Sequence, residues 1–94
     1  MKKCINPQAI EIQKRFFQAL EMAVQDGVIS GLQEFCKNHN LNRVKYQRIK
    51  TDLQKTESEQ LYKIIDLDAL QYICKDYNVS PDWLLFGRGK MRRR

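Results

Sequence analysis

The sequence of 94 residues predicts an all-α fold, and three observations support this prediction. Apolar residues recur every three or four positions, which is the spacing of one buried face of a helix. Most of these stretches begin at a proline or at a capping residue and end near glycine or asparagine. Hydrophobic residues make up 43% of the chain, which is enough to fold around one small core.

The first helix is expected from Pro7 to Gln25. Proline suits a first helical turn because the amide donor that it lacks has no partner there. The apolar stripe of this stretch consists of Ile12, Phe16, Leu20, Ala23 and Val24. Gly27 follows, and glycine readily adopts the left-handed conformation that often ends a helix. Val28 and Ile29 then predict a short buried connector.

A second, short helix is expected to begin at Ser30 and to stop near His39-Asn40. Ser30 and Gln33 have the spacing of a capping box, in which each side chain bonds the backbone amide of the other residue. The predicted buried face consists of Leu32, Phe35 and Cys36. Asn40 tolerates the left-handed conformation of a tight turn, so the chain is expected to reverse there.

Asn42 is expected to cap a third helix that opens at Arg43, after Leu41 has filled the turn. The buried stripe of this helix is Tyr46, Ile49 and Leu53. Its remaining face is Arg43, Val44, Lys45, Gln47, Arg48 and Lys50. No acidic residue lies between Lys37 and Lys50. A helix surface with one sign of charge repels itself unless an anion lies against it.

The connection 51–65 is polar at first and ends in apolar residues, and its shape is left open. A fourth helix is expected to follow a cap at Asp66 or Asp68. Its apolar face would be Leu67, Leu70, Ile73, Cys74 and Tyr77. Ser80 is expected to cap a last short helix that ends at Gly87. The inward residues of that helix would be Trp83, Leu84 and Phe86.

We expect one domain at residues 9–87, preceded by an extension at 1–8 and followed by a basic, mobile tail at 88–94. The net charge is +6 and the isoelectric point is near 9.4, which favours a polyanionic partner. The sequence contains neither a secretory signal nor a run of 18 uncharged apolar residues. We therefore expect no membrane partner.

Three cysteines without a CxxC pair, and the single His39, predict neither a disulfide framework nor a structural zinc site. Cys36 and Cys74 lie among apolar residues and are interpreted as reduced thiols of a cytoplasmic protein. The sequence lacks clustered carboxylates in an apolar setting and a glycine-rich phosphate loop. We expect neither an enzyme nor a bound cofactor.

Two short helices joined by a tight turn, the second with a basic face, are typical of a protein that reads the DNA major groove. The residues expected to face bases are Arg43, Val44, Gln47 and Arg48, and those expected on phosphates are Lys45 and Lys50. Arginine donates a bidentate pair to guanine, glutamine pairs with adenine, and valine meets the thymine methyl group. Double-stranded DNA is therefore the predicted partner.

The stretch from Leu32 to Lys50, LQEFCKNHNLNRVKYQRIK, resembles the helix-turn-helix of the Cro and phage-repressor family, also called the xenobiotic-response-element family. Phe35-Cys36 stand where that family has Leu-Ala, and residues 40–42 stand where it has Gly-Val-Ser. A second stretch at 66–87, DLDALQYICKDYNVSPDWLLFG, is similar to the fourth and fifth helices of the family. The two stretches occur in the order that the family requires.

The resemblance implies a compact five-helix bundle of the lambda-repressor-like type. It also implies a bacterial or phage-type transcriptional regulator that binds a palindromic operator as a homodimer. Leu32 stands where the family often has a phosphate-binding Gln, but Ser30 and nearby backbone amides are able to hold a phosphate. Residues 50–52, Lys-Thr-Asp, replace the usual Glu-x-Gly, so contacts beyond Lys50 are not carried over.

The alternative is a protein-interaction module, such as an antitoxin-like or adaptor domain on the same helical fold. Val44 and the connection 51–65 leave room for a protein partner. DNA binding through phosphates weakens steeply with salt, whereas an apolar protein contact does not. The tail at 92–94 is open to two interpretations, a nonspecific phosphate contact or a solubilising end.

Overall fold

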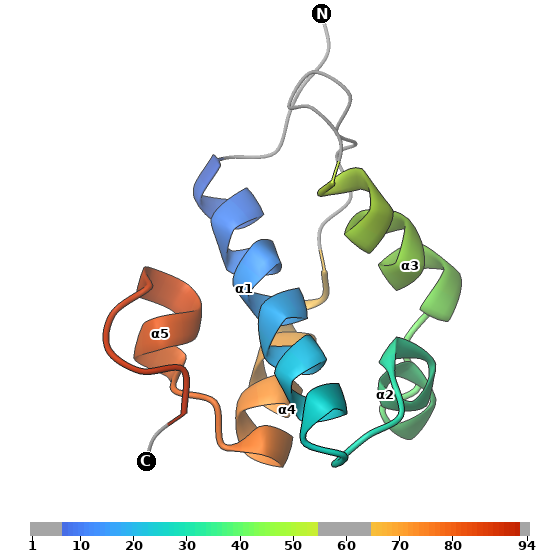
Figure 1. The fold of residues 1–94 in the computed structure, drawn as a ribbon. Helices are drawn as coiled ribbons and strands as arrows, with labels where there is room; N and C mark the ends of the chain where they lie inside the picture. The colour runs from blue at the N-terminus through green and yellow to red at the C-terminus, as the bar shows by residue number, and fades with distance from the viewer. Residues whose placement is uncertain (1–6, 55–64, 93–94) are drawn as a thin grey trace, which may run out of the picture.

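The computed structural model describes residues 7–54 and 65–92. Within these two segments the chain is all-helical, as predicted, and forms a small bundle (Figure 1). The helices are α1 (Pro7–Gln25), α2 (Leu32–Asn38), α3 (Arg43–Asp52), α4 (Leu67–Tyr77) and α5 (Pro81–Phe86). Most of the predicted 51–65 connection lies outside the described residues. None of the helices described is long and apolar enough to cross a membrane.

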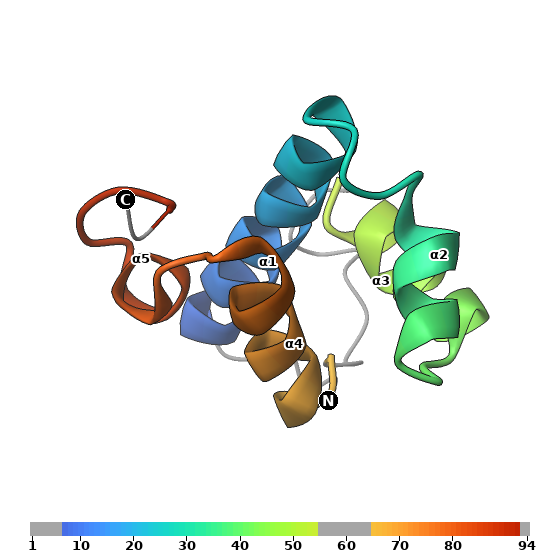
Figure 2. The same ribbon diagram turned by 90° about the horizontal axis from the view of Figure 1, so that it is seen from below.

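Helix α1 is the central element of the bundle. It packs against both α4 and α5, while α2 packs mainly against α3. In Figures 1 and 2 the α2–α3 pair lies on one side of α1 and α4, and α5 lies on the opposite side. One side of α3 therefore faces away from the rest of the bundle.

Aromatic side chains from three helices meet in the core. The fully buried ring of Phe16, on α1, lies 5.7 Å from that of Phe35 on α2 and 6.1 Å from that of Tyr46 on α3, measured between centroids. Phe17 packs edge-to-face on Phe16 at 5.0 Å. Aromatic side chains bury large apolar areas, so this cluster fixes α2 and α3 to α1.

The predicted helix ends are largely confirmed. Gly27 and Gly87 are left-handed, with φ of 77° and 70°, and follow α1 and α5 as expected. Asn40 is left-handed in the turn between α2 and α3, with φ of 55°. Asn42 and Ser80 cap α3 and α5, and each side chain accepts a hydrogen bond from the backbone amide three residues on.

The start of α2 differs from the predicted capping box. Gly31 is the N-cap, and no side chain caps the helix there. The Ser30 backbone amide and hydroxyl both donate to Glu34 Oε1, at 2.9 and 2.7 Å. Because the cap is one residue later than predicted, the third helical position falls on Glu34 instead of Gln33, and Glu34 reaches back to Ser30.

Three side chains that were predicted to be buried are exposed. Val28 is 61%, Leu67 85% and Phe86 63% exposed. Helix α4 instead buries Ala69 and Ile73 fully, and Leu67 lies on the far side because two helical positions are about 200° apart.

The C-terminal segment, expected from the sequence to be a basic, mobile tail, contacts the bundle as far as Arg92. The Ser80 amide donates to the Met91 carbonyl at 2.7 Å, and Met91 is partly buried against the core. Arg92 forms an isolated β-bridge with Val79 and an ion pair with Asp26. Residues 93–94, like most of the N-terminal extension, lie outside the described segments.

Candidate nucleic-acid interface

Helix α3 has a buried side and an exposed side. Tyr46 is fully buried, Ile49 is 3% exposed, and Leu53 just beyond the helix packs against the core. The four residues predicted to face bases, Arg43, Val44, Gln47 and Arg48, are all exposed. At about 100° per residue Val44, Gln47 and Arg48 project away from the buried stripe, while Arg43 projects sideways, about a quarter turn from it. The structure thus brings these four residues together on one surface, which we call the outward face.

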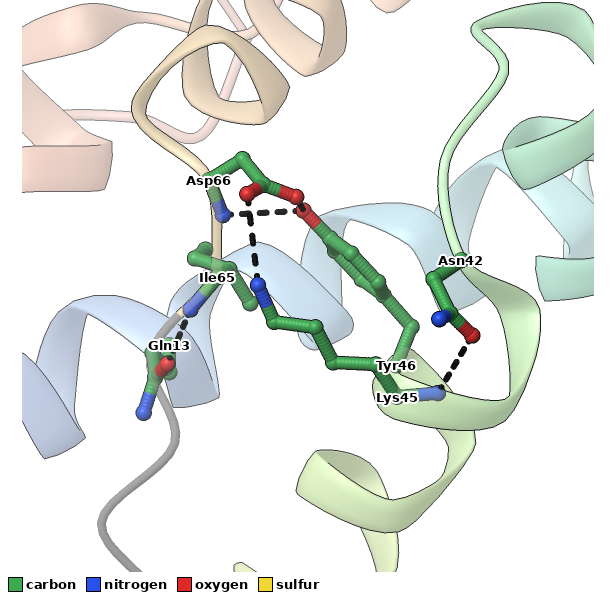
Figure 3. Close-up of polar contacts among 6 residues, drawn as sticks. All are labelled: Gln13, Asn42, Lys45, Tyr46, Ile65 and Asp66. Atoms are coloured by element: carbon green, nitrogen blue, oxygen red, sulfur yellow. Dashed lines mark hydrogen bonds and ion pairs between the residues drawn. The ribbon is translucent and has the colours of Figure 1, made fainter.

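Tyr46 anchors α3 through both its ring and its hydroxyl group. The ring is fully buried, while the hydroxyl donates to Asp66 Oδ2 at 2.7 Å and accepts from the Asp66 amide at 2.9 Å (Figure 3). Burial raises the pKa of the Tyr46 phenol well above its usual value, so the group stays a neutral donor. This anchor sets the rotation of α3 about its axis.

Gln13 on α1 makes a parallel contact with the neighbouring residue of the chain. Its Oε1 accepts from the Ile65 amide at 2.8 Å, and the side chain is 1% exposed (Figure 3). Two consecutive amides, of Ile65 and Asp66, are therefore held by α1 and α3 just before α4 begins. Gln13 was not predicted as a buried residue, although its spacing from Phe16 and Phe17 places it on the buried stripe of α1.

Lys45 lies at one edge of the outward face and is paired within the protein. Its Nζ is 3.2 Å from Asp66 Oδ1, on the carboxylate that also binds Tyr46 (Figure 3). The hydrogen bond from Tyr46, followed by the contacts of Lys45, lowers the pKa of the Asp66 carboxyl group. Asp66 is the second functional residue that the sequence analysis missed.

Ser30 and Lys50 lie together at the opposite edge of the outward face. They line a hollow of about 200 Å³ between α1, the start of α2 and α3, which Glu21 also borders. The hydrogen bonds from Ser30 lower the pKa of the Glu34 carboxyl group, which stays charged there. Two carboxylates therefore adjoin the predicted phosphate contacts at this edge.

The turn between α2 and α3 is held against α4 by His39. Its Nε2 is 2.6 Å from Asp76 Oδ2, and its ring stacks on Tyr72 with centroids 4.0 Å apart. His39 thus acts as a turn residue, as predicted, and its partners come from a helix more than thirty residues away. Within the two described segments, no group of three His, Cys, Asp or Glu side chains is placed to hold a metal ion.

The outward face carries two guanidinium groups, one carboxamide and one isopropyl group. The guanidinium groups donate hydrogen bonds, the carboxamide both donates and accepts, and the isopropyl group makes apolar contact. The edges of base pairs in the major groove present the matching acceptors, donors and methyl groups. Comparisons with family models, with curated proteins and with solved structures found no match to this chain.

Proposed function

We propose that the chain is a sequence-specific DNA-binding protein that regulates transcription, with α3 as the helix that enters the major groove. One observation carries the proposal. Arg43, Val44, Gln47 and Arg48 are exposed together along α3, on the surface that the buried anchors Tyr46 and Ile49 leave free. A helix that reads bases needs one exposed side and one buried side. Its exposed side chains must reach the groove, while its buried side chains fix the angle at which the helix enters the groove.

The charge around α3 supports the same proposal. The segment from Lys37 to Lys50 contains no acidic residue and has five Lys or Arg side chains, so its own field repels cations and attracts phosphates. Lys45 and Lys50 flank the outward face, where the walls of the groove would lie. A helix-turn-helix needs two consecutive short helices joined by a tight turn, and α2, the turn at 39–42 and α3 meet this need, which supports our proposal of the lambda-repressor-like fold type.

We further propose that two copies bind one palindromic operator. A single outward face of four residues reads only a few base pairs, whereas a two-fold pair doubles the site and its specificity. An apolar hollow of about 240 Å³ between α4 and α5 supports such pairing, because a second copy seated there would leave the outward face of α3 uncovered. Its lining includes Leu70, Cys74 and Leu85.

Selection of bound duplexes from a random pool tests the proposal. The expected result is a palindromic consensus whose affinity falls steeply between about 50 and 200 mM salt. The stoichiometry in an ultracentrifuge should be two chains per duplex. A pool without enrichment, from a protein shown to be folded, would overturn the proposal.

A matched pair of variants locates the interface. Arg43→Ala with Arg48→Ala should abolish enrichment, because both changes fall on the outward face. Arg88→Ala with Lys90→Ala removes the same charge from the segment directly after α5, the helix on the opposite side of α1 and α4 from α3, and should preserve the consensus. Equal losses in both variants would point to a nonspecific charge effect, and binding of a protein partner without salt dependence would favour an interaction module.

A further inference from the structure

The Asp66 carboxylate bonds side chains of α3 and does not cap α4, the helix that it precedes. It occupies the N-cap position of α4, yet it makes no capping hydrogen bond there. One of its oxygens accepts from the Tyr46 hydroxyl at 2.7 Å and the other lies 3.2 Å from Lys45 Nζ (Figure 3). One acidic group is thus bonded to the buried anchor of α3 and to a cation at the edge of the outward face.

The Lys45–Asp66 pair lies where DNA would approach. The two side chains are 29% and 41% exposed, so solvent and ligands reach them. Asp66 accepts from the Lys45 ammonium as a phosphate oxygen would, and it places a negative charge beside the expected path of the DNA backbone. A partly exposed ion pair is weak, so release of Lys45 from it should change DNA affinity by only a small factor.

On the basis of the proposed function, we propose that Asp66 is a positioning residue that limits DNA affinity by holding Lys45 away from the phosphate backbone. The Tyr46 bond keeps the carboxylate in place, because Tyr46 cannot move without disturbing the core. The protein therefore binds DNA through one phosphate contact fewer than its cations around α3 would allow. Its specificity then depends more strongly on the base contacts of the outward face.

Asp66→Asn is the informative variant because it removes the charge and keeps an oxygen that accepts from Tyr46. Binding to the selected duplex should become roughly two- to fivefold tighter, as expected for release of one exposed ion pair. The salt dependence, plotted as log affinity against log salt, should steepen by about 0.9, which is the value for one added phosphate contact. Both are measured by fluorescence anisotropy, with thermal melts to confirm folding.

Asp68→Asn is the matched control. It removes an equal charge from the first turn of α4, but Asp68 bonds Tyr72 at 3.2 Å and not Lys45. Its salt dependence should equal that of the wild type. In a Lys45→Gln background, Asp66→Asn should leave the salt dependence unchanged, because the released cation is gone, and should raise affinity no more than Asp68→Asn does.

Lys45→Gln alone provides a second test that leaves Asp66 intact. It should weaken binding less than twofold and leave the salt dependence unchanged, since Lys45 makes no phosphate contact in the wild type. A loss of about 0.9 in that slope, equal gains in Asp66→Asn and Asp68→Asn, or a steeper salt dependence that persists without Lys45 would overturn the inference. If the folded wild type binds no duplex even at low salt, the proposed function itself fails, and the inference fails with it.

Discussion

Different residues of α3 anchor the helix to the core and form its exposed surface. Tyr46 contributes a buried ring and a bonded hydroxyl, while its neighbours Val44 and Gln47 are exposed. The spacing of apolar residues predicted this division, because helical periodicity is a local property. The bonds of Asp66 to α3 could not be predicted. Its partner Tyr46 lies twenty residues earlier, and the sequence does not specify the path of the connection between them.

Arg43 is the strongest candidate for a specific base contact. Arg43→Ala should cost about 1–3 kcal/mol on the selected duplex and relax sequence choice at one position, because a bidentate contact to guanine is lost. Binding measurements on a panel of single-base variants of the site test this prediction. Arg88→Ala, with the same loss of charge, serves as the control. An equal loss of affinity for the specific and for a random duplex would show that Arg43 does not read a base.

Tyr46 should also leave a signature in the pH dependence of stability. Its pKa is raised in the folded state, so its contribution is fully present below the unfolded value of about 10 and is lost as pH rises above it. The free energy of unfolding should therefore fall above about pH 10, as the unfolded chain ionises first. Denaturant unfolding from pH 7 upward measures this decline.

Tyr46→Phe should flatten that alkaline decline and cost about 1–3 kcal/mol at pH 7, because the Asp66 amide and carboxylate lose a partner. Part of the decline should remain, since burial raises the pKa of Tyr77 to about 12. An unchanged alkaline profile in Tyr46→Phe would contradict the assignment of this group.

The ends of the helices were more predictable than their faces. Capping by Asn42 and left-handed Gly87 depend on a few adjacent residues, and both occur as expected. The buried faces of α4 and α5 depend instead on how each helix approaches α1, which sequence spacing does not determine. The sequence alone does not decide whether Leu67 or Ala69 faces the core, because a helix with either residue inward fits the spacing of apolar residues. The packing of α4 on α1 decides it.

The cap of α3 links helix stability to the proposed contact surface. Asn42→Ala should cost about 1 kcal/mol of stability, because the Lys45 amide loses its acceptor. Fraying of the first turn should also weaken specific DNA binding, since Arg43 and Val44 belong to that turn. Denaturant melts and anisotropy measure the two effects.

Asn42→Ser is the matched control because serine caps helices about as well as asparagine. It should restore both stability and affinity. If Asn42→Ser binds as poorly as Asn42→Ala while remaining stable, Asn42 contacts DNA directly and the capping explanation is wrong.

At the scale of the whole molecule, α1 joins two parts that lie on opposite sides of it. Phe16 and Gln13 connect it to α3 and to the start of α4, while Arg15 Nε donates to the Leu84 carbonyl of α5 at 2.8 Å. The all-α class followed from periodicity, but this placement did not, because it rests on contacts between distant segments. The docking of residues 88–92 went unpredicted for the same reason, since their composition is that of a solvated tail.

The C-terminal segment should therefore contribute to stability as well as to charge. Deletion of residues 88–94 should lower the free energy of unfolding by about 1–3 kcal/mol, because Met91 leaves the core and the Ser80 amide loses its acceptor. Deletion of residues 93–94 alone removes two arginines and should leave stability unchanged, which separates packing from charge. If the terminal arginines grip phosphate, DNA affinity corrected for folding should fall in both deletions, and further in the longer one, which also removes Arg88, Lys90 and Arg92. If the longer deletion leaves the melting curve of the wild type intact, the segment is only a solubilising end, and its packing on α5 and Asp26 contributes nothing to the fold.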